Sequence, residues 1–156
     1  MKKIIIALIV CFFALALTAC AGNSEQNGSG GEEQTEITAV YLYINGNKAE
    51  VTLAENKATA ALVEILQNGD ITYTADDYGG FEKVGALGHS LPTENSQITT
   101  EAGDVILYSG NQIVLFYGSN SWSYTRLGKI NGYSVTDLRT FLCAGSGSVQ
   151  VRISLK

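Results

Sequence analysis

The sequence predicts a mainly β fold, a closed barrel or a sandwich, on the basis of three observations. Short runs rich in β-branched and aromatic residues recur along residues 37–156, about eight in all. Turn residues such as Gly, Asn and Ser separate successive runs, which indicates hairpins and antiparallel pairing. Only two segments space their apolar residues as a helix does. Antiparallel strands in this number close into a barrel or a sandwich, and the two short helices would cover its ends.

The first half of this region predicts a hairpin followed by a helix. Residues 37–44 are β-branched and aromatic, and a tight turn of Asn and Gly leads to a returning strand at residues 48–53. Asn56 is a typical helix N-cap, and Gly69 is placed to end the helix that follows. The apolar residues between them recur at helical spacing: Ala60, Leu62, Val63, Ile65 and Leu66.

The middle of the chain is harder to interpret. Residues 70–74 predict a strand, and residues 81–84 and Leu87 interrupt the polar stretch that follows. This stretch, residues 75–103, is rich in Gly, Asp, Ser and Thr and contains Pro92, the only proline. We expect a long, partly ordered excursion over the surface there. Long loops on a rigid scaffold are where binding sites tend to lie.

The second half predicts the strongest hairpin of the chain, at residues 104–108 and 112–117, which are apolar on both faces and therefore central. Residues 122–130 alternate as a strand. Ser134, with Asp137 three residues later, resembles a capping box and opens a short helix. Residues 149–155 alternate cleanly and form the closing strand.

The N-terminal segment predicts a lipoprotein signal peptide at residues 1–19. Two lysines precede an apolar run, and the run ends in Leu17-Thr18-Ala19-Cys20. This stretch resembles the lipobox of bacterial lipoproteins, in which the cysteine is lipidated. The alternative, a transmembrane anchor, needs roughly 20 apolar residues, and this run is shorter. We therefore expect Cys20 to carry the lipid, with the protein in the cell envelope, extracytoplasmic and lipid-anchored to a membrane.

A polar stretch at residues 20–36 predicts a disordered tether between the lipid and a single domain at residues 37–156, because it has no large apolar side chain to bury. The chain has 10 basic and 15 acidic residues and no basic cluster, which excludes nucleic-acid binding. One histidine and scattered carboxylates give no metal-ligand spacing, so we expect no metal and no cofactor. Cys143 reads as a small buried hydrophobic residue rather than a reactive thiol.

Three blocks carry a resemblance to a known family: EAGDVILY at residues 101–108, VLFYG at 114–118 and SYTRLGKI at 123–130. In order and spacing they resemble a bacterial family of cyclophilin-like-fold domains, over about residues 40–155. The resemblance implies a small closed cyclophilin-like β-barrel of about eight strands, with two short helices at its openings. True cyclophilins use an arginine near a Phe-x-x-x-x-Gln-Gly-Gly motif; this chain has no such motif and no arginine before Arg126.

Arg126 is the first candidate for a ligand-binding residue, together with Tyr124 and Trp122. The three share one parity of a strand, and an arginine fork between aromatic rings can hold a carboxylate or a peptide carbonyl. The alternative is a structural arginine paired with a neighbouring acid: Asp104, Glu101 or Glu82.

Three further residues are candidates for a ligand-binding site, and each has an alternative structural role. Phe116 would form the floor of a pocket or belong to the core. His89 would carry a proton near neutral pH or lie solvated in its loop. Glu82, with Asp76 and Asp77, would bind a cation or solvate a Gly-rich turn. The segment at residues 78–81 would be a mobile flap or an ordinary turn.

The leading functional hypothesis is a non-enzymatic envelope lipoprotein that binds a peptide segment or a small ligand near Arg126. The alternative is a divergent peptidyl-prolyl isomerase or foldase acting on exported proteins. Arg126 would then stabilise the twisted amide electrostatically, and Phe116 and Trp122 would form the apolar surface on which the substrate lies. A third reading is an interaction subunit that uses an exposed apolar face.

Overall fold

The computed structural model describes residues 36–156. The predicted signal peptide, Cys20 and nearly all of the predicted tether lie outside these residues. No helix within them is long and apolar enough to cross a membrane. The elements follow in chain order: β1 (Ala39–Ile44), β2 (Asn47–Leu53), α1 (Lys57–Gln67), β3 (Ile71–Tyr78), β4 (Glu82–Ala86), β5 (Ser96–Thr99), β6 (Asp104–Tyr108), β7 (Gln112–Phe116), β8 (Ser121–Ile130), α2 (Val135–Phe141) and β9 (Val149–Ser154).

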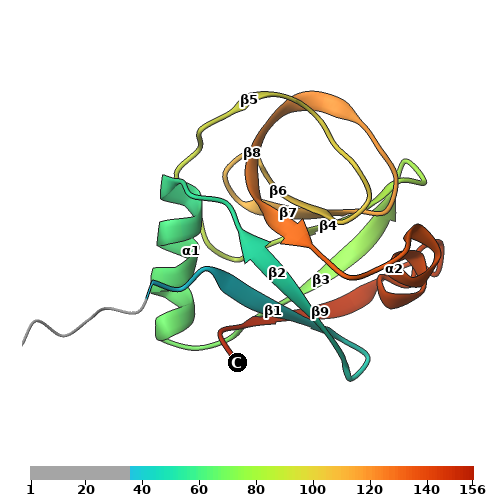
Figure 1. Ribbon diagram of the computed structural model, residues 1–156, viewed down its shortest axis with the longest axis horizontal. Helices are drawn as coiled ribbons and strands as arrows, with labels where there is room; N and C mark the ends of the chain where they lie inside the picture. Colours follow the sequence, from blue (N-terminus) through green and yellow to red (C-terminus); the bar gives the residue numbers. More distant parts are fainter. Residues whose placement is uncertain (1–35) are drawn as a thin grey trace, which may run out of the picture. The chain divides into compact units, whose positions relative to one another are not determined.

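Eight of these strands form a closed antiparallel barrel, as Figure 1 shows. The order around the barrel is β2-β1-β9-β3-β4-β7-β6-β8, and β8 pairs back onto β2 to close it. The remaining strand, β5, pairs only with the first part of β8. The predicted mainly β barrel of about eight strands with two short helices is therefore confirmed, with one extra strand outside the ring.

The barrel interior is filled by alternate residues of the strands, because successive side chains of a strand point to opposite faces. β1 contributes Val40, Leu42 and Ile44, and β7 contributes Ile113 and Leu115, all buried. The other parity of β6, β7 and β8 faces outward, where it forms a second apolar cluster of Ile106, Val114, Phe116 and Tyr124. The predicted hairpin of β6 and β7 is apolar on both faces because one face packs in the barrel interior and the other packs in the outer cluster.

The two helices lie on opposite sides of the barrel in Figure 1. Asn56 caps α1, since its side chain accepts a hydrogen bond from the Thr59 backbone N–H at 3.0 Å. The Ser134 hydroxyl accepts from the Asp137 N–H at the start of α2 in the same way. Both predicted caps are therefore confirmed. Cys143, just after α2, is half-buried and packs against the main core.

The predicted surface excursion at residues 75–103 is wrong in part. β3 continues to Tyr78, and β4 and β5 both fall inside this segment. Its polar composition misleads because two of its charged residues face inward and satisfy each other. Asp77 and Lys83 lie opposite on β3 and β4, and their side chains form an ion pair of 2.9 Å inside the barrel.

Hydrogen bonds with other groups support the Asp77–Lys83 pair. The Lys83 side chain is fully buried and its ammonium also donates to the Gly147 carbonyl. Asp77 accepts from the Gly147 N–H at 2.9 Å and from the Tyr117 hydroxyl at 3.0 Å. Burial acts to raise the pKa of Asp77, but these hydrogen bonds outweigh it and lower the pKa to about 2.

β8 changes its neighbours and its parity along its length. Residues 121–124 pair with β5, whereas residues 125–130 pair with β6 and β2. A bulge opposite Val105 and Ile106 places an extra residue in β8. Leu127 and Ile130 therefore both face the core, and the simple alternation expected for residues 122–130 ends at this bulge.

We expect Gly128→Ala to destabilise the barrel by about 3 kcal/mol. A Cβ at this position would overlap the backbone carbonyl oxygen of Thr52 and lie 2.8 Å from Val51 Cγ1, where β2 closes on β8. Urea unfolding followed by circular dichroism measures the loss. Ser123→Ala, an exposed change on the same strand, should alter the free energy of unfolding by less than about 0.5 kcal/mol. Equal stability of both variants would contradict this account of closure.

Removing Asp77 alone should cost more stability than removing both charges of the ion pair. Asp77→Ala leaves the Lys83 ammonium without its anion, and we expect a loss of about 3 kcal/mol or more. Lys83→Met in the Asp77→Ala background should recover most of that loss, because no charge then remains buried. Thermal unfolding of the two variants checks this; no recovery in the double variant would contradict it.

Candidate functional site

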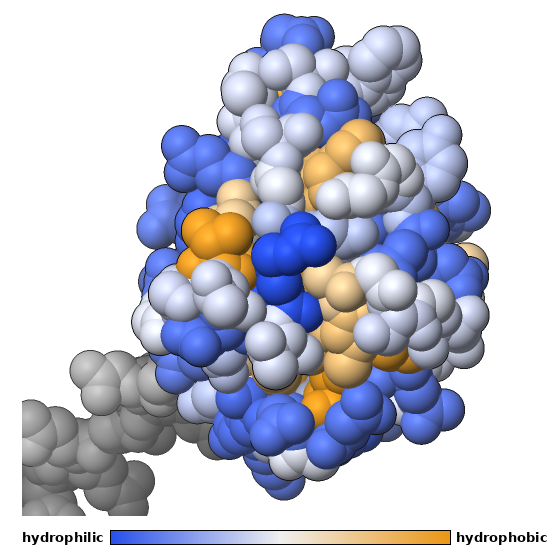
Figure 2. Space-filling model, turned by 90° about the vertical axis from the view of Figure 1, so that its right-hand side faces the viewer, coloured by the Kyte–Doolittle hydropathy of each residue, from blue (hydrophilic) through white to orange (hydrophobic). Residues whose placement is uncertain are grey.

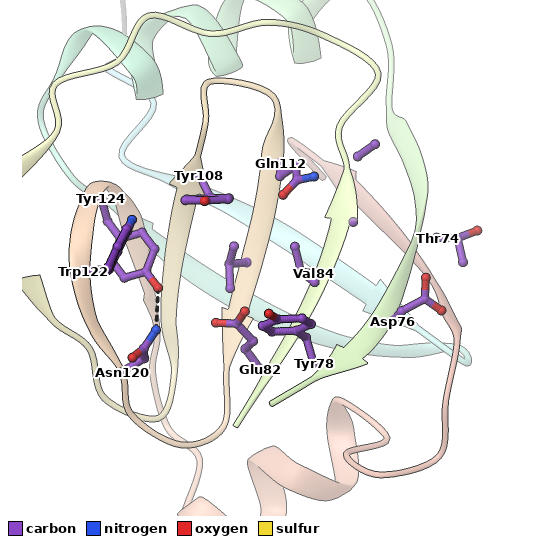
Figure 3. Close-up of a pocket in the computed structure, with 13 residues that line it drawn as sticks. Thr74, Asp76, Tyr78, Glu82, Val84, Tyr108, Gln112, Asn120, Trp122 and Tyr124 are labelled. Carbon is purple, nitrogen blue, oxygen red and sulfur yellow. Dashed lines mark hydrogen bonds between the residues drawn. The ribbon is translucent and has the colours of Figure 1, made fainter. Parts of the chain in front are cut away.

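A pocket of about 700 Å³ lies on the outer face of the barrel. Its floor is formed by outward-facing residues of β4 and β7, and the first part of β8 rises at one side of it (Figure 3). The lining residues are Thr74, Asp76, Tyr78, Glu82, Val84, Gly85, Ala86, Tyr108, Gln112, Val114, Asn120, Trp122 and Tyr124.

Exposed aromatic side chains gather at this pocket. Tyr78 is 64% exposed, Trp122 57% and Tyr108 38%. In residues 36–156 the only other large apolar side chain exposed to this degree is Val135 on α2, outside the lining. Apolar rings that converge on a concave surface are typical of a ligand site rather than of an ordinary surface.

The outer apolar cluster supports the pocket from below. Phe116 is fully buried and stacks parallel to Phe81, with ring centroids 6.3 Å apart. Tyr124 meets Phe116 edge-on at 5.9 Å and Tyr108 edge-on at 6.1 Å. The Asn120 amide donates to the Tyr124 hydroxyl at 2.9 Å, a bond drawn in Figure 3. These contacts hold the β8 side of the pocket in place before any ligand arrives.

Glu82 is the most unusual residue of the pocket. Only 7% of it is exposed, and its Oε2 atom has no hydrogen-bond partner in the described residues. Burial raises the pKa of its carboxyl to about 7. In Figure 3 this carboxyl group projects into the pocket between Asn120 and Tyr78. A carboxyl in this state is poised between its neutral and charged forms near neutral pH.

The charged groups of the lining are all acidic. Glu82 and Asp76 are its carboxylates, and no lysine, arginine or histidine of the described residues lines the pocket. Asp76 accepts a hydrogen bond from the Ser148 hydroxyl. No group of three or more His, Cys, Asp or Glu side chains in residues 36–156 is arranged to hold a metal ion. The pocket is therefore apolar and aromatic with negative character.

The structure brings together three of the six residues predicted from the sequence. Trp122, Tyr124 and Glu82 line the pocket. Phe116 lies beneath it in the outer cluster and does not reach the lining. His89 is exposed in the connection between β4 and β5, outside the lining.

Arg126 lies outside the lining as well and is engaged with Asp104. Its Nη1 atom is 2.6 Å from Asp104 Oδ1, and Lys129 Nζ is 3.0 Å from the same oxygen. The Glu101 N–H donates to the other oxygen of Asp104 at 2.9 Å. The bulge in β8 brings Arg126 and Lys129 to the same buried carboxylate although they are three residues apart. Arg126 therefore makes the structural ion pair with Asp104 that the sequence analysis gave as the alternative to ligand binding.

Sequence reasoning missed Tyr78, Tyr108, Gln112 and Asn120 as pocket residues. Tyr108 has the parity of Ile106 on β6, so once the opposite face of that strand is assigned to the core, it must point outward. Tyr78 lies in the segment interpreted as a flap or a turn, and no local pattern distinguishes it. Only the pairing of β3, β4 and β7 shows that it stands beside Glu82.

The face of the molecule that carries α2, turned to the viewer in Figure 2, shows apolar residues in separate patches among polar ones. Val135 of α2 is an exposed apolar side chain outside the pocket lining. Scattered apolar residues of this kind are normal on a soluble surface. The exposed aromatic residues of the pocket are thus more concentrated than the apolar residues seen on this face.

Comparisons with solved structures find the same fold elsewhere. A hypothetical protein from Archaeoglobus fulgidus, solved in solution, is similar with a TM-score of 0.54 and 18% identity, over 76% of this chain and 95% of that one. McbB in complex with tryptophan is similar with a TM-score of 0.53 and 12% identity, over 74% of this chain and 44% of that one. No curated protein is significantly similar in sequence.

The sequence profile of the cyclophilin-like family matches residues 42–154, which include every strand of the barrel from the middle of β1 to the end of β9. The match agrees with the closed antiparallel ring and with the resemblance carried by the blocks in β6, β7 and β8. This chain therefore belongs to the cyclophilin-like family.

Proposed function

We propose that this protein is a membrane-anchored envelope lipoprotein whose barrel binds a small ligand or a peptide segment without chemical turnover. The observation that carries the proposal is the convergence of Tyr78, Tyr108 and Trp122, all exposed, around the nearly buried Glu82 in one pocket. A few polar groups in a mostly apolar concavity fix the orientation of a ligand, and the rings supply contact area.

The size of the pocket supports a small molecule or a single peptide side chain. Its volume of about 700 Å³ lies within the range of roughly 300–1,000 Å³ that is usual for such sites. One of the structures with the same fold, McbB, was solved in complex with tryptophan. A small ligand of comparable size would fit between Tyr78 and Trp122 on the floor of β4 and β7.

The state of Glu82 supports binding rather than a purely structural role. A buried carboxylate with an unpaired oxygen destabilises the folded state, whereas an apolar side chain of similar size would not. Other enclosed carboxylates of this barrel, Asp77 and Asp104, are each paired with a basic side chain. A ligand that completes the hydrogen bonding of Glu82 would offset this destabilisation. Glu82 would then contribute to binding while it lowers the stability of the free protein.

Anchoring to a membrane is supported by the sequence of residues 1–20, with its lysines, apolar run and Cys20. A diacyl anchor on Cys20 would hold the chain on the membrane. A polar tether of residues 21–36 would let the barrel reach on the order of 20–25 Å from the surface. The pocket would then be open to extracytoplasmic solutes and exported chains.

Binding can be detected through Trp122, the only tryptophan of the chain. We expect members of a library of blocked tetrapeptides and fragment-sized molecules to shift its fluorescence and to raise the melting temperature of the full-length chain. Tyr78→Ala should weaken each such ligand about tenfold, the effect of losing one aromatic contact. Val135→Ala removes an exposed apolar side chain outside the pocket and should leave affinity unchanged.

Two results would contradict the proposal. One is a folded chain in which no library member changes either Trp122 fluorescence or the melting temperature. The other is acceleration of X-Pro isomerisation in a test peptide that is lost in Arg126→Ala, which would make the protein an isomerase.

Glu82→Gln should stabilise the folded chain at pH 8 and leave it unchanged at pH 4. The folded-state pKa of about 7 lies above the usual value of an unfolded glutamate, so ionisation costs stability as pH rises between the two values. At pH 8 the gain should approach about 3 kcal/mol, since each pKa unit corresponds to about 1.4 kcal/mol. Urea unfolding at both pH values measures this gain in the free energy of unfolding. A gain that is the same at both pH values would show that ionisation of Glu82 does not destabilise the folded chain.

A further inference from the structure

The basic side chains that form ion pairs in the described residues are all paired with acids other than Glu82. Lys83, its neighbour on β4, points into the barrel and pairs with Asp77 at 2.9 Å. Arg126 pairs with Asp104 at 2.6 Å. In the part of the chain that the structure describes, no salt bridge reaches Glu82. The fold thus neutralises its other buried acids but leaves this one facing the pocket.

When Glu82 is ionised, its missing partner must donate a hydrogen bond, because a carboxylate oxygen accepts and does not donate. A donor that is also positively charged gives the strongest such bond. An anionic ligand would place a second negative charge beside Glu82 and Asp76, with no basic residue of the described lining to offset it. A metal ion would need more oxygen ligands than these two carboxylates supply.

The aromatic residues favour the same kind of ligand. The faces of Trp and Tyr rings attract cations, and Tyr78, Tyr108 and Trp122 all border the pocket. Between them the floor is apolar, formed by Val84, Val114 and Ala86. An alkyl stem would lie on this floor while its charged end reaches Glu82, as a lysine side chain lies along apolar surface.

We propose that the pocket binds a primary ammonium group on an alkyl stem, carried either by the lysine side chain of a peptide or by a small free amine. Glu82 is its ionic and hydrogen-bonding partner, and Tyr78 and Trp122 flank the stem. This inference rests on the proposed ligand-binding function and names the chemical class of the ligand.

The site should bind such a cation more tightly as pH rises. Glu82 must be ionised to pair with ammonium, and burial holds its pKa at about 7 in the free protein. The other titratable groups of the lining are Asp76 and Tyr78 of β3, Tyr108 of β6 and Tyr124 of β8, and Tyr117 lies beyond β7. The pKa values of Tyr117 and Tyr124 are raised, chiefly by burial, so neither tyrosine titrates between pH 6 and 8. Affinity should increase about tenfold across this range.

The test compares probes that share a stem and differ in charge. Isothermal titration calorimetry of the full-length chain would use N-α-acetyl-lysine methylamide, the matching norleucine derivative, and n-butylamine. We expect the lysine derivative to bind at least tenfold more tightly than the norleucine derivative at pH 8. Glu82→Gln should abolish this preference and leave norleucine binding within about twofold of its native value. Glu64→Gln, an exposed acid on α1, makes the same change of net charge and should preserve the preference.

The outcomes separate this inference from the proposed function. Equal affinity for the lysine and norleucine derivatives would overturn the ammonium assignment and leave a neutral ligand-binding pocket. Binding of no probe, while library members still bind, would do the same. Binding of nothing in either experiment would overturn both. If the preference is found, tighter binding of the lysine derivative than of n-butylamine assigns the source to a peptide, and the reverse order assigns it to a small amine.

Discussion

The structure depends on a single strand that serves two sheets. The second part of β8 closes the barrel by pairing with β2 and β6, while its first part leaves the ring and pairs with β5. Gly128 allows the closure, because any side chain there would overlap the backbone of β2 at Thr52. The bulge before it reverses the parity of the strand. Trp122 and Tyr124, which line the pocket, lie on the part of β8 that precedes the bulge and pairs with β5.

The barrel treats its enclosed acids in two ways. Asp77 and Asp104 are paired with basic side chains and bonded to backbone N–H groups, so their charges are compensated. Such pairs contribute little net stability but are costly to break, because one charge would then remain buried alone. Glu82 has neither form of compensation for Oε2 and carries a raised pKa. This contrast within one small domain supports the proposal that Glu82 binds a ligand.

The sequence predicted the fold class and most of the elements from local patterns. Alternation identified β1 and β9, and runs that are apolar on both faces identified β6 and β7. The side chains of Asn56 and Ser134 identified the starts of both helices. It failed between residues 75 and 103, because the burial of Lys83 against Asp77 makes a core position look like a solvated one. It also predicted the site only in part. Trp122, Tyr124 and Glu82 were candidates, but Arg126 was placed first among them.

The sequence by itself determined that the chain is an antiparallel β domain, since strand period, turn residues and helix caps are properties of neighbouring residues. It also carries the blocks by which the cyclophilin-like family is recognised. Only the tertiary structure decided which face of each strand packs in the core and which acidic side chain pairs with which basic one. Arg126 and Lys129 meet on Asp104 through a bulge, and Tyr78 meets Glu82 through the register of β3 on β4. These contacts depend on a bulge and on the register between strands, and no local period records either.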